Sequence, residues 1–350
     1  MKIRIAFFDA KEYDIESFNL SNTTHSDSEG EFEFKFYETR LTEDTVNLAR
    51  DYDVVCVFVN DIVNRIVIGK LYQYGIELIA LRCAGYNNVD IEYAYGRIHV
   101  VRVPAYSPHA VAEHAMALLL TSVRRTHKAY IRTRDFNFSL NGLTGFDLYD
   151  KTVGIVGTGK IGRILADICA GFGMQVLAYD KFPAGNFEYE YVPLKKIWEE
   201  SDIISFHCPL NEETRHLVNA DSIALMKKGV VLINTSRGAI IDSEALLAGI
   251  KDRKIGAACL DVYEEESDVF YHDFSGHIVE DDTLARLISM PNVIVTSHQA
   301  FLTREALDNI ADTTLNNIRQ FFGEGSCENE ICYRCNQYES CPKGTNKSCF

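Results

Sequence analysis

The segment from Thr152 to Asp180 constrains the fold of this chain more than any other part of the sequence. An apolar run, TVGIV, precedes GTGKIG, in which Gly157, Gly159 and Gly162 have G-x-G-x-x-G spacing, and apolar residues at helical spacing follow. The first glycine permits a tight turn, the second lets the backbone approach a pyrophosphate, and the third lets helix and strand pack closely. The segment therefore predicts a strand, a turn and a helix whose N-terminus binds a dinucleotide.

Asp180 lies eighteen residues after Gly162, at the end of the next apolar run, QVLAYD. A carboxylate at this position can accept hydrogen bonds from the adenosine ribose hydroxyls, and it would repel a 2′-phosphate. The sequence therefore predicts NAD rather than NADP, although the neighbouring Lys181 weakens this argument. A glycine-rich turn that binds nothing is the alternative, and the combination of strand, helix and acidic residue disfavours it.

Strand-like apolar runs alternate with helical patterns along the chain. Up to residue 103 these runs are KIRIAFFD, FEFKFY, DVVCVFV, IELIAL and IHVVRV, and from residue 151 they are TVGIV, QVLAY, DIISF, VVLIN, AACLD and NVIVT. One long helix is expected at 107–125 and another at 304–322. This alternation predicts an α/β fold with two Rossmann-like or flavodoxin-like domains, parallel doubly wound sheets, and a cleft between the domains.

A length of 350 residues with 47% hydrophobic content suits two domains better than one. The expected substrate domain is discontinuous and comprises residues 1–103 together with about 300–325. Residues 104–299 are expected to form the NAD-binding domain, and 326–350 a cysteine-rich C-terminal tail.

The formal net charge of -15 disfavours nucleic acid as a partner, because the field of the whole chain repels phosphate backbones. The N-terminal run MKIRIAFFDA is too short for a signal peptide, and AVAEHAMALLLTSV, interrupted by Glu113 and His114, is too short for a membrane span. A cytoplasmic protein without a membrane partner is therefore expected. An anionic substrate would need a positive charge supplied within its own site.

Residues just after the strands of a parallel sheet are candidates for a site, because ligands lie beyond the carboxyl ends of such strands. Residues that could bind a ligand or take part in catalysis follow four of the later runs. They are His207, Cys208 and Pro209; Thr235, Ser236, Arg237 and Gly238; Asp261 and Glu266; and His298.

Three of these residues suit the reduction of a carbonyl group by hydride. Arg237 can hold a carboxylate through two hydrogen bonds and polarise the neighbouring carbonyl. His298 can give its proton to the carbonyl oxygen, and Glu266 can hydrogen-bond the other ring nitrogen. Each has an ordinary alternative: a surface arginine, a histidine at a sheet edge, and a solvated glutamate within the acidic run YEEESD. Their succession after a dinucleotide motif favours catalysis.

Several long segments resemble the D-2-hydroxyacid dehydrogenase family, and within it the fermentative D-lactate dehydrogenases of bacteria. They are LRCAGYNNVD, VRVPAYSPHAVAEHA, RTRDFNFSLNGLTG, GTGKIG, NTSRGAIID, DVYEEE and SHQAFLT, and the likeness extends from about Lys2 to Gly325. The resemblance implies NADH-dependent, reversible reduction of pyruvate to D-lactate, with Arg237, Glu266 and His298 as the catalytic residues. It also implies a homo-oligomer, a dimer or tetramer, assembled through the nucleotide domain.

The resemblance further implies contacts to both small molecules. The substrate would contact the backbone of Ala84 and Gly85 together with Tyr106 and Arg237, and Phe301 would confine the pocket around the methyl group of pyruvate. NAD contacts are implied for Lys160, Ile161, Asp180, Cys208, Pro209, Thr214, Thr235, Ser236 and Asp261. We add the neighbouring His207 and the three glycines of the motif to this set.

The tail beyond Gly325 departs from the family pattern and carries Cys327, Cys332, Cys335, Cys341 and Cys349. The first three have the C-x4-C-x2-C spacing of plant-type iron–sulfur sites, but a fourth ligand at Cys341 or Cys349 would be unusually near. Zinc is a second possibility, although a second C-x-x-C pair is absent. A reduced or redox-sensitive tail without metal is the third, and no metal is expected in the catalytic site.

Two other functions stay open at this stage. One keeps the chemistry but acts on a larger 2-oxo acid, which the aromatic residues of the pocket disfavour. The other is an NAD(H)-sensing binding protein, because transcriptional corepressors share this fold. The intact catalytic residues do not separate an enzyme from such a sensor, whereas a turnover assay does.

Overall fold

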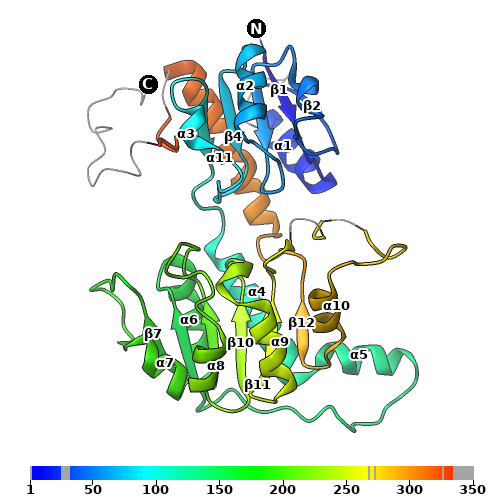
Figure 1. The fold of residues 1–350 in the computed structure, drawn as a ribbon, viewed down its shortest axis with the longest axis vertical. Helices are drawn as coiled ribbons and strands as arrows, with labels where there is room; N and C mark the ends of the chain where they lie inside the picture. The colour runs from blue at the N-terminus through cyan, green and yellow to red at the C-terminus, as the bar shows by residue number, and fades with distance from the viewer. Residues whose placement is uncertain (1, 25–31, 267–268, 272, 325–326, 334–350) are drawn as a thin grey trace. The chain divides into compact units, whose positions relative to one another are not determined.

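The computed structural model describes residues 2–24, 32–266, 269–271, 273–324 and 327–333 (Figure 1). The chain divides into two compact units. Unit 1 comprises Met1–Ser107 and Leu302–Phe350, and unit 2 comprises Pro108–Phe301. Both ends of the chain therefore contribute to one unit. Among the described residues, no helix combines the length and apolar character needed to cross a membrane.

Unit 1 is a five-stranded parallel sheet with the order β2-β1-β3-β4-β5. Its strands are β1 (Ile3–Phe7), β2 (Phe32–Phe36), β3 (Val54–Val57), β4 (Leu78–Leu81) and β5 (His99–Arg102). Its helices are α1 (Glu12–Thr24), η1 (Val46–Ala49), α2 (Arg65–Gln73), α3 (Ile91–Ala94) and α11 (Arg304–Glu324). The last helix returns from the far end of the chain and packs against α1.

Unit 2 is a seven-stranded parallel sheet with the order β12-β11-β10-β9-β6-β7-β8. Its strands are β6 (Thr152–Val156), β7 (Gln175–Tyr179), β8 (Glu190–Tyr191), β9 (Ile203–Phe206), β10 (Val230–Asn234), β11 (Ile255–Leu260) and β12 (Val293–Val295). Its helices are α4 (Pro108–Arg124), α5 (Thr126–Arg134), α6 (Lys160–Gly171), α7 (Leu194–Glu200), α8 (Ala220–Leu225), η2 (Gly238–Ile240), α9 (Ser243–Lys251) and α10 (Asp282–Ser289). The predicted α/β class with parallel sheets is confirmed.

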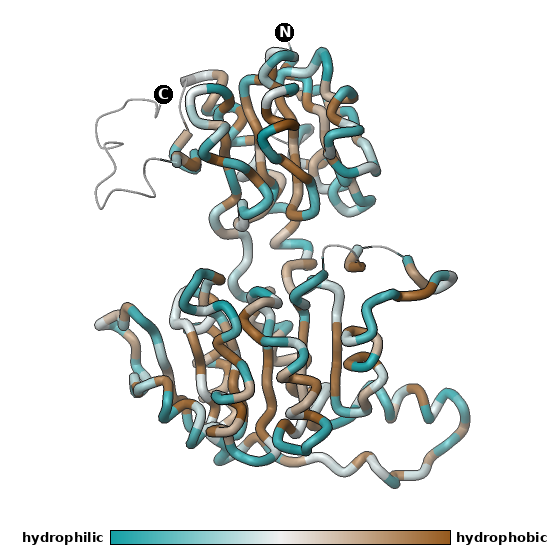
Figure 2. The backbone as a smooth tube through the Cα atoms, viewed as in Figure 1, coloured by the Kyte–Doolittle hydropathy of each residue, from teal (hydrophilic) through white to brown (hydrophobic). Residues whose placement is uncertain are grey.

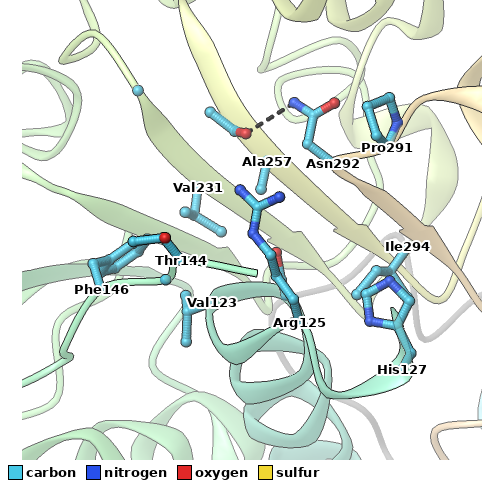
Figure 3. A pocket seen from close by; sticks show the side chains of 14 residues that line it. Val123, Arg125, His127, Thr144, Phe146, Val231, Ala257, Pro291, Asn292 and Ile294 are labelled. Carbon is cyan, nitrogen blue, oxygen red and sulfur yellow. Dashed lines mark hydrogen bonds between the residues drawn. The ribbon is translucent and has the colours of Figure 1, made fainter. Parts of the chain in front are cut away.

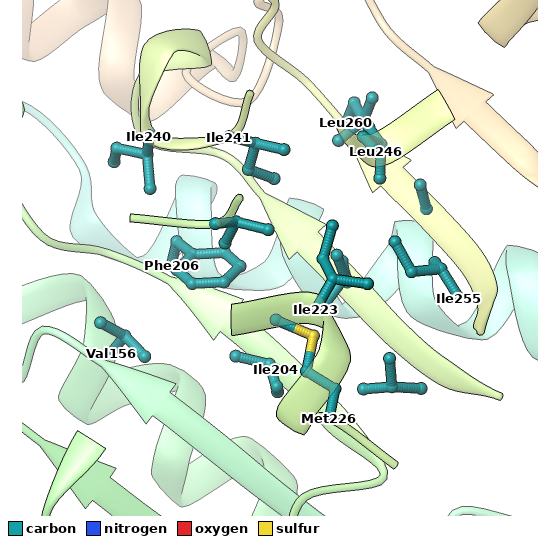
Figure 4. Close-up of a cluster of buried hydrophobic side chains, with 14 of the residues drawn as sticks. Val156, Ile204, Phe206, Ile223, Met226, Ile240, Ile241, Leu246, Ile255 and Leu260 are labelled. Carbon is teal, nitrogen blue, oxygen red and sulfur yellow. The ribbon is translucent and has the colours of Figure 1, made fainter. Parts of the chain in front are cut away.

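The central strands β6, β9 and β10 of unit 2 are buried along almost their whole length, as expected for strands covered on both faces, and their apolar runs are visible in Figure 2. On β10, Val231 and Ile233 belong to the core under α4 and α6, whereas Leu232 belongs to the core on the opposite face. Figure 4 shows this second core, in which Ile204 and Phe206 of β9 pack near Ile223 of α8. Helices therefore cover both faces, as a doubly wound sheet requires.

The first described residues of the tail pack on the edge strand of unit 1. Glu330 pairs with Val101 in an antiparallel bridge, and the amide of Ile331 donates to the carbonyl of Val100 over 2.8 Å. The Glu330 carboxylate also lies 2.7 Å from Nδ1 of His99. Residues 327–333 thus extend the sheet of unit 1 beyond β5.

Candidate active site

The glycine motif forms a turn between β6 and α6 that comes very close to the neighbouring strand. Gly157 has φ of +96°, and a Cβ there would lie 2.6 Å from the amide nitrogen of Cys208. A Cβ on Gly162 would lie 2.0 Å from the carbonyl oxygen of Gly157. Only glycine fits these two positions without moving the backbone. The space beside Gly159, the N-cap of α6, is open to at least 4 Å.

Asp180 lies at the carboxyl end of β7 and is held against the same turn. Its carboxylate accepts hydrogen bonds from the amide of Thr158 at 2.7 Å, the hydroxyl of Thr158 at 3.0 Å and the amide of Phe182 at 2.9 Å. Burial alone raises the pKa of Asp180, but these hydrogen bonds outweigh it and hold the pKa below its ordinary value. The residue is therefore a fixed anion at neutral pH, with lone pairs left for further donors.

The other predicted cofactor contacts lie at the carboxyl ends of β9 and β10. The hydroxyl of Ser236 donates to the carbonyl of Cys208 over 2.7 Å, so the two loops are joined. The hydroxyl of Thr214 donates to the carbonyl of Pro209 over 2.6 Å and closes the first loop on itself. Lys160 and Ile161 begin α6. The loop after β9 borders the Gly157 turn directly, because the backbone of His207 and Cys208 lies against Gly157.

The residues at this edge fit a dinucleotide. Among the described residues, the hydroxyl oxygen of Thr235 is buried and has no hydrogen-bond partner, which a polar group of a ligand would satisfy. The open space at Gly159 and the amides at the start of α6 suit a pyrophosphate, and Asp180 suits a ribose. Cys208 is only 9% exposed and burial raises the pKa of its thiol to about 11, so it presents a neutral, apolar wall.

Glu266 and His298 form a hydrogen-bonded pair beyond the ends of β11 and β12. Nδ1 of His298 lies 2.8 Å from Oε1 of Glu266, and the amide of Tyr263 donates to Oε2 of Glu266 over 2.9 Å. Both carboxylate oxygens are therefore occupied, and Nε2 is the ring nitrogen left for another partner. The side chains are 18% and 21% exposed, so the pair is sheltered but reachable.

Arg237 follows β10 and lies just before η2. Its Nη1 donates to the carbonyl of Ser236 over 2.7 Å, and its own carbonyl accepts from the side-chain amide of Asn234 over 2.9 Å. It makes no ion pair within the described part of unit 2, so its charge is available to an anionic ligand. Arg237, Glu266 and His298 therefore occupy one edge of one sheet, at the ends of successive strands.

Asp261 was predicted to contact the cofactor, and in the structure its carboxylate is fully buried and shapes the loop of His298. It accepts hydrogen bonds from the hydroxyl of Thr296 at 2.6 Å and from the amides of Gln299 and Ala300, both at 2.9 Å. Its carbonyl accepts from the amide of His298 at 2.7 Å. A contact from Asp261 to the cofactor stays a prediction.

Sequence reasoning missed a set of residues that joins the loops carrying the predicted catalytic residues. The carboxylate of Glu264 accepts from Nη2 of Arg215 at 2.8 Å and lies 2.8 Å from Nε2 of His216. The backbone amide of His216 in turn donates to the carbonyl of Ala239, two residues after Arg237, over 2.8 Å. In the acidic run YEEESD no sequence signal distinguishes Glu264 from its neighbours. We call Arg215, His216 and Glu264 the Glu264 clamp.

The remaining predicted substrate contacts are divided between the units. Ala84 and Gly85 follow β4 of unit 1, where Nη1 of Arg102 donates to the carbonyl of Ala84 over 2.8 Å. Tyr106 precedes α4, and its carbonyl accepts from the side chain of Asn309 over 2.7 Å. Phe301 is 7% exposed at the end of unit 2. Their contacts with substrate stay predictions.

The predicted metal site of the tail falls largely outside the described residues, which do not include Cys335, Cys341 or Cys349. The described pair, Cys327 and Cys332, is buried. The thiol of Cys327 donates to the side-chain carbonyl of Asn317 over 3.3 Å. Within the residues that the structure describes, no three histidine, cysteine or acidic side chains are grouped to hold a metal ion.

Comparisons with known proteins agree with this geometry. Residues 116–300 match the family model described as "D-isomer specific 2-hydroxyacid dehydrogenase, NAD binding domain". D-lactate dehydrogenase of Escherichia coli (strain K12) is 46% identical over 333 residues, which cover 94% of this chain and 100% of that protein. A 2-hydroxyacid dehydrogenase homologue of Haemophilus influenzae is 48% identical and covers 94% of this chain and 99% of its own length.

Solved structures show the same likeness. The apo structure of D-lactate dehydrogenase from Escherichia coli superposes with a TM-score of 0.85 at 45% identity, covering 94% of this chain and 100% of that one. The pyruvate reductase of Chlamydomonas reinhardtii gives a TM-score of 0.86 at 43% identity, with coverage of 91% and 96%. Unit 2 is therefore an NAD-binding domain, and the chain belongs to the family of NAD-dependent, D-isomer specific 2-hydroxyacid dehydrogenases.

Proposed function

We propose that this chain catalyses the reversible, NADH-dependent reduction of pyruvate to D-lactate. The observation that carries this proposal is the Glu266–His298 pair, in which Oε1 and Nδ1 lie 2.8 Å apart. It lies at the same sheet edge as Arg237, which makes no ion pair within the described part of unit 2. Two relatives named D-lactate dehydrogenase or pyruvate reductase, each more than 40% identical, support the choice of substrate.

Arg237 is proposed to anchor the substrate. Its planar guanidinium can donate two parallel hydrogen bonds to the carboxylate of a 2-oxo acid and draw electron density from the adjacent carbonyl. Because the chain has a formal net charge of -15, a cation at close range is needed to bind an anionic substrate there. The hydrogen bond from Nη1 to the carbonyl of Ser236 leaves the other guanidinium donors for this role.

His298 is proposed to move the proton. When bound, NADH supplies the hydride that the carbonyl carbon receives. Nε2 of His298 then gives its proton to the carbonyl oxygen, and in lactate oxidation the same nitrogen accepts the hydroxyl proton. Glu266 accepts a hydrogen bond from Nδ1, which fixes the ring orientation and stabilises the protonated imidazole.

A substrate panel tests the assignment. We expect pyruvate to give the highest kcat/KM for NADH oxidation among pyruvate, 2-oxobutyrate, phenylpyruvate and hydroxypyruvate, with D-lactate as the product by chiral analysis. The predicted pocket wall Phe301 leaves little room for a larger side chain. If phenylpyruvate is the best substrate, a larger 2-oxo acid is the true one; if no substrate turns over while NADH binds, the chain is a sensor.

We further propose that the protein is a cytoplasmic homo-oligomer. Cys56, Cys169 and Cys259 are buried single thiols, a use of cysteine that suits a reducing compartment. The exposed aromatic residues between α5 and β6, among them Phe136 and Phe138, support assembly through unit 2.

A further inference from the structure

A cavity lies in unit 2 at the amino ends of β10, β11 and β12, the sheet edge opposite the Gly157 turn. Its volume is about 160 Å³, which is room for about five water molecules. The end of α4, the start of α5 and the segment 144–146 form its walls. Figure 3 shows Arg125 extending along this cavity, with Val231, Ala257 and Asn292 around its guanidinium group.

The segment that contributes Arg125 and His127 to the cavity wall carries an unbalanced positive charge. Residues 124–134 contain five Lys and Arg residues and no acidic residue, in a chain with a formal net charge of -15. Within the described residues none of these five forms an ion pair, whereas Lys181, Lys196 and Arg215 of the same unit do. Burial, and to a smaller extent the neighbouring cations, lower the pKa of both His127 and Lys128.

Arg125 is held in place by the backbone and retains free donors. Its φ of +53° lies in the left-handed region, which is costly for a residue with a side chain and persists where the surroundings impose it. Nη1 donates to the carbonyl of Gly142 over 3.1 Å. Within the described residues this is the one hydrogen bond of its guanidinium, so most of the five N–H donors are left for a ligand.

His127 adds a second polar group to the same wall. Its Nδ1 is buried and has no hydrogen-bond partner among the described residues. An orphaned buried nitrogen is costly unless something fills the space beside it. The apolar floor, which includes Val123 and Ile294, strengthens any charge interaction made there by excluding water.

We propose that this cavity is a binding site for a small anion with a phosphate or carboxylate group, held by Arg125 and His127. A phosphate or a short dicarboxylate is of the right size and charge, and the guanidinium plane can hold either through paired hydrogen bonds. The site lies at the sheet edge away from the proposed catalytic residues, so it does not depend on the proposed function.

Anion binding to the full chain tests the proposal. Isothermal titration calorimetry uses inorganic phosphate and, separately, succinate, in saturating NADH and at constant ionic strength. We expect saturable binding of at least one anion, with one site per chain. Arg125→Gln and His127→Gln should each weaken the Kd at least tenfold. The matched control Arg124→Gln removes the adjacent, exposed charge and should leave the Kd within twofold.

Further measurements keep the outcome interpretable. Circular dichroism and the Kd for NADH show whether each variant is folded. Because succinate can also reach the proposed substrate anchor, the titration is repeated in Arg237→Gln, where binding should persist. Binding that Arg125→Gln leaves unchanged, or no saturable binding, would overturn the proposal. Loss of the oligomer in Arg125→Gln, without anion binding to the unmodified chain, would assign these cations to a subunit interface instead.

Discussion

At the scale of single residues, His298 is constrained through both its backbone and its ring. Its φ of +52° is unfavourable for a residue with a side chain and costs on the order of 1–3 kcal/mol. The buried Asp261 accepts the amide of His298 and two amides that follow it, which holds the loop in this conformation. Glu266 then fixes the ring through Nδ1, so that only Nε2 can reach a substrate.

His298→Ala is expected to remove the proton donor without removing the cofactor site. We expect kcat for pyruvate reduction to fall by about 10²–10⁴-fold, the usual contribution of general acid–base catalysis. The Kd for NADH, measured by fluorescence titration, should stay within about threefold because the Gly157 turn is untouched. The exposed His277 in His277→Ala serves as the control. Unchanged turnover in His298→Ala would remove His298 from the mechanism.

We expect the folded protein to lose stability in mild acid because of His207. Burial lowers its pKa from 6.5 to about 4, so the folded state binds a proton less readily than the unfolded state between these values. This contribution to stability is complete above pH 6.5 and is lost as the pH falls toward 4, by at most about 1.4 kcal/mol per pH unit.

The variant His207→Gln can still hydrogen-bond Ser205 but cannot titrate. Its Tm, measured by calorimetry from pH 4.5 to 7, should fall less steeply with acid than that of the unmodified chain. His277→Gln should keep the original slope. Parallel slopes for all three proteins would show that His207 is not the group responsible.

At the scale of secondary-structure elements, three loops of unit 2 stack on one another and carry the proposed catalytic residues. A Cβ on Gly238 would lie 2.0 Å from the carbonyl carbon of Tyr263, so the loop after β10 touches the loop after β11. The Glu264 clamp ties the loop after β9 to the loop after β11, and the amide of His216 donates to Ala239. The spacing of Arg237 and Glu266 thus depends on residues that touch neither substrate nor cofactor.

Glu264→Gln is expected to reduce kcat by about tenfold, because a neutral amide binds Arg215 and His216 less well and loosens the segment that carries Glu266. The Kd for NADH should not change. Glu212→Gln, which removes an exposed charge from the loop after β9, should be silent. If Glu264 acts by positioning Glu266, its substitution should have little further effect on kcat in Glu266→Gln. Additive losses in the double variant would instead indicate a general structural role.

Elements with a strong periodicity of apolar residues could be predicted from the sequence, whereas elements set by tertiary contacts could not. The strand, turn and helix of residues 152–171 follow from apolar spacing and the glycines, and the two-residue strand β8 is too short to leave a pattern. The helix expected at 107–125 matches α4, but the sequence did not indicate that α5 begins directly after it, with Arg125 in the left-handed region that arginine does not prefer. The ion pairs of Glu264 form between loops 48 and 49 residues apart, and an isolated sequence does not record them.

At the scale of the whole molecule, a large net negative charge coexists with an exposed apolar segment. A formal net charge of -15 keeps copies of the chain apart in general. Within the described residues, however, the segment between α5 and β6 exposes large apolar side chains, among them Phe136, Phe138 and Leu140, at 84%, 71% and 78%. Exposed apolar side chains that follow one another in this way mark interaction surfaces.

We expect the exposed apolar side chains of this segment to form the subunit interface. We expect a native mass that is a multiple of 39.6 kDa by sedimentation equilibrium. Replacing Phe136, Phe138 and Leu140 together by serine should shift the protein toward the monomer, because each side chain buried at an interface contributes about 1.5–3 kcal/mol. Phe182→Ser is the matched control, since Phe182 is also 79% exposed in unit 2 but lies after β7. A monomeric unmodified chain, or a triple variant of unchanged mass, would show that these side chains serve another purpose. Retention of NADH binding by the monomer would separate assembly from the cofactor site, which unit 2 builds from its own residues.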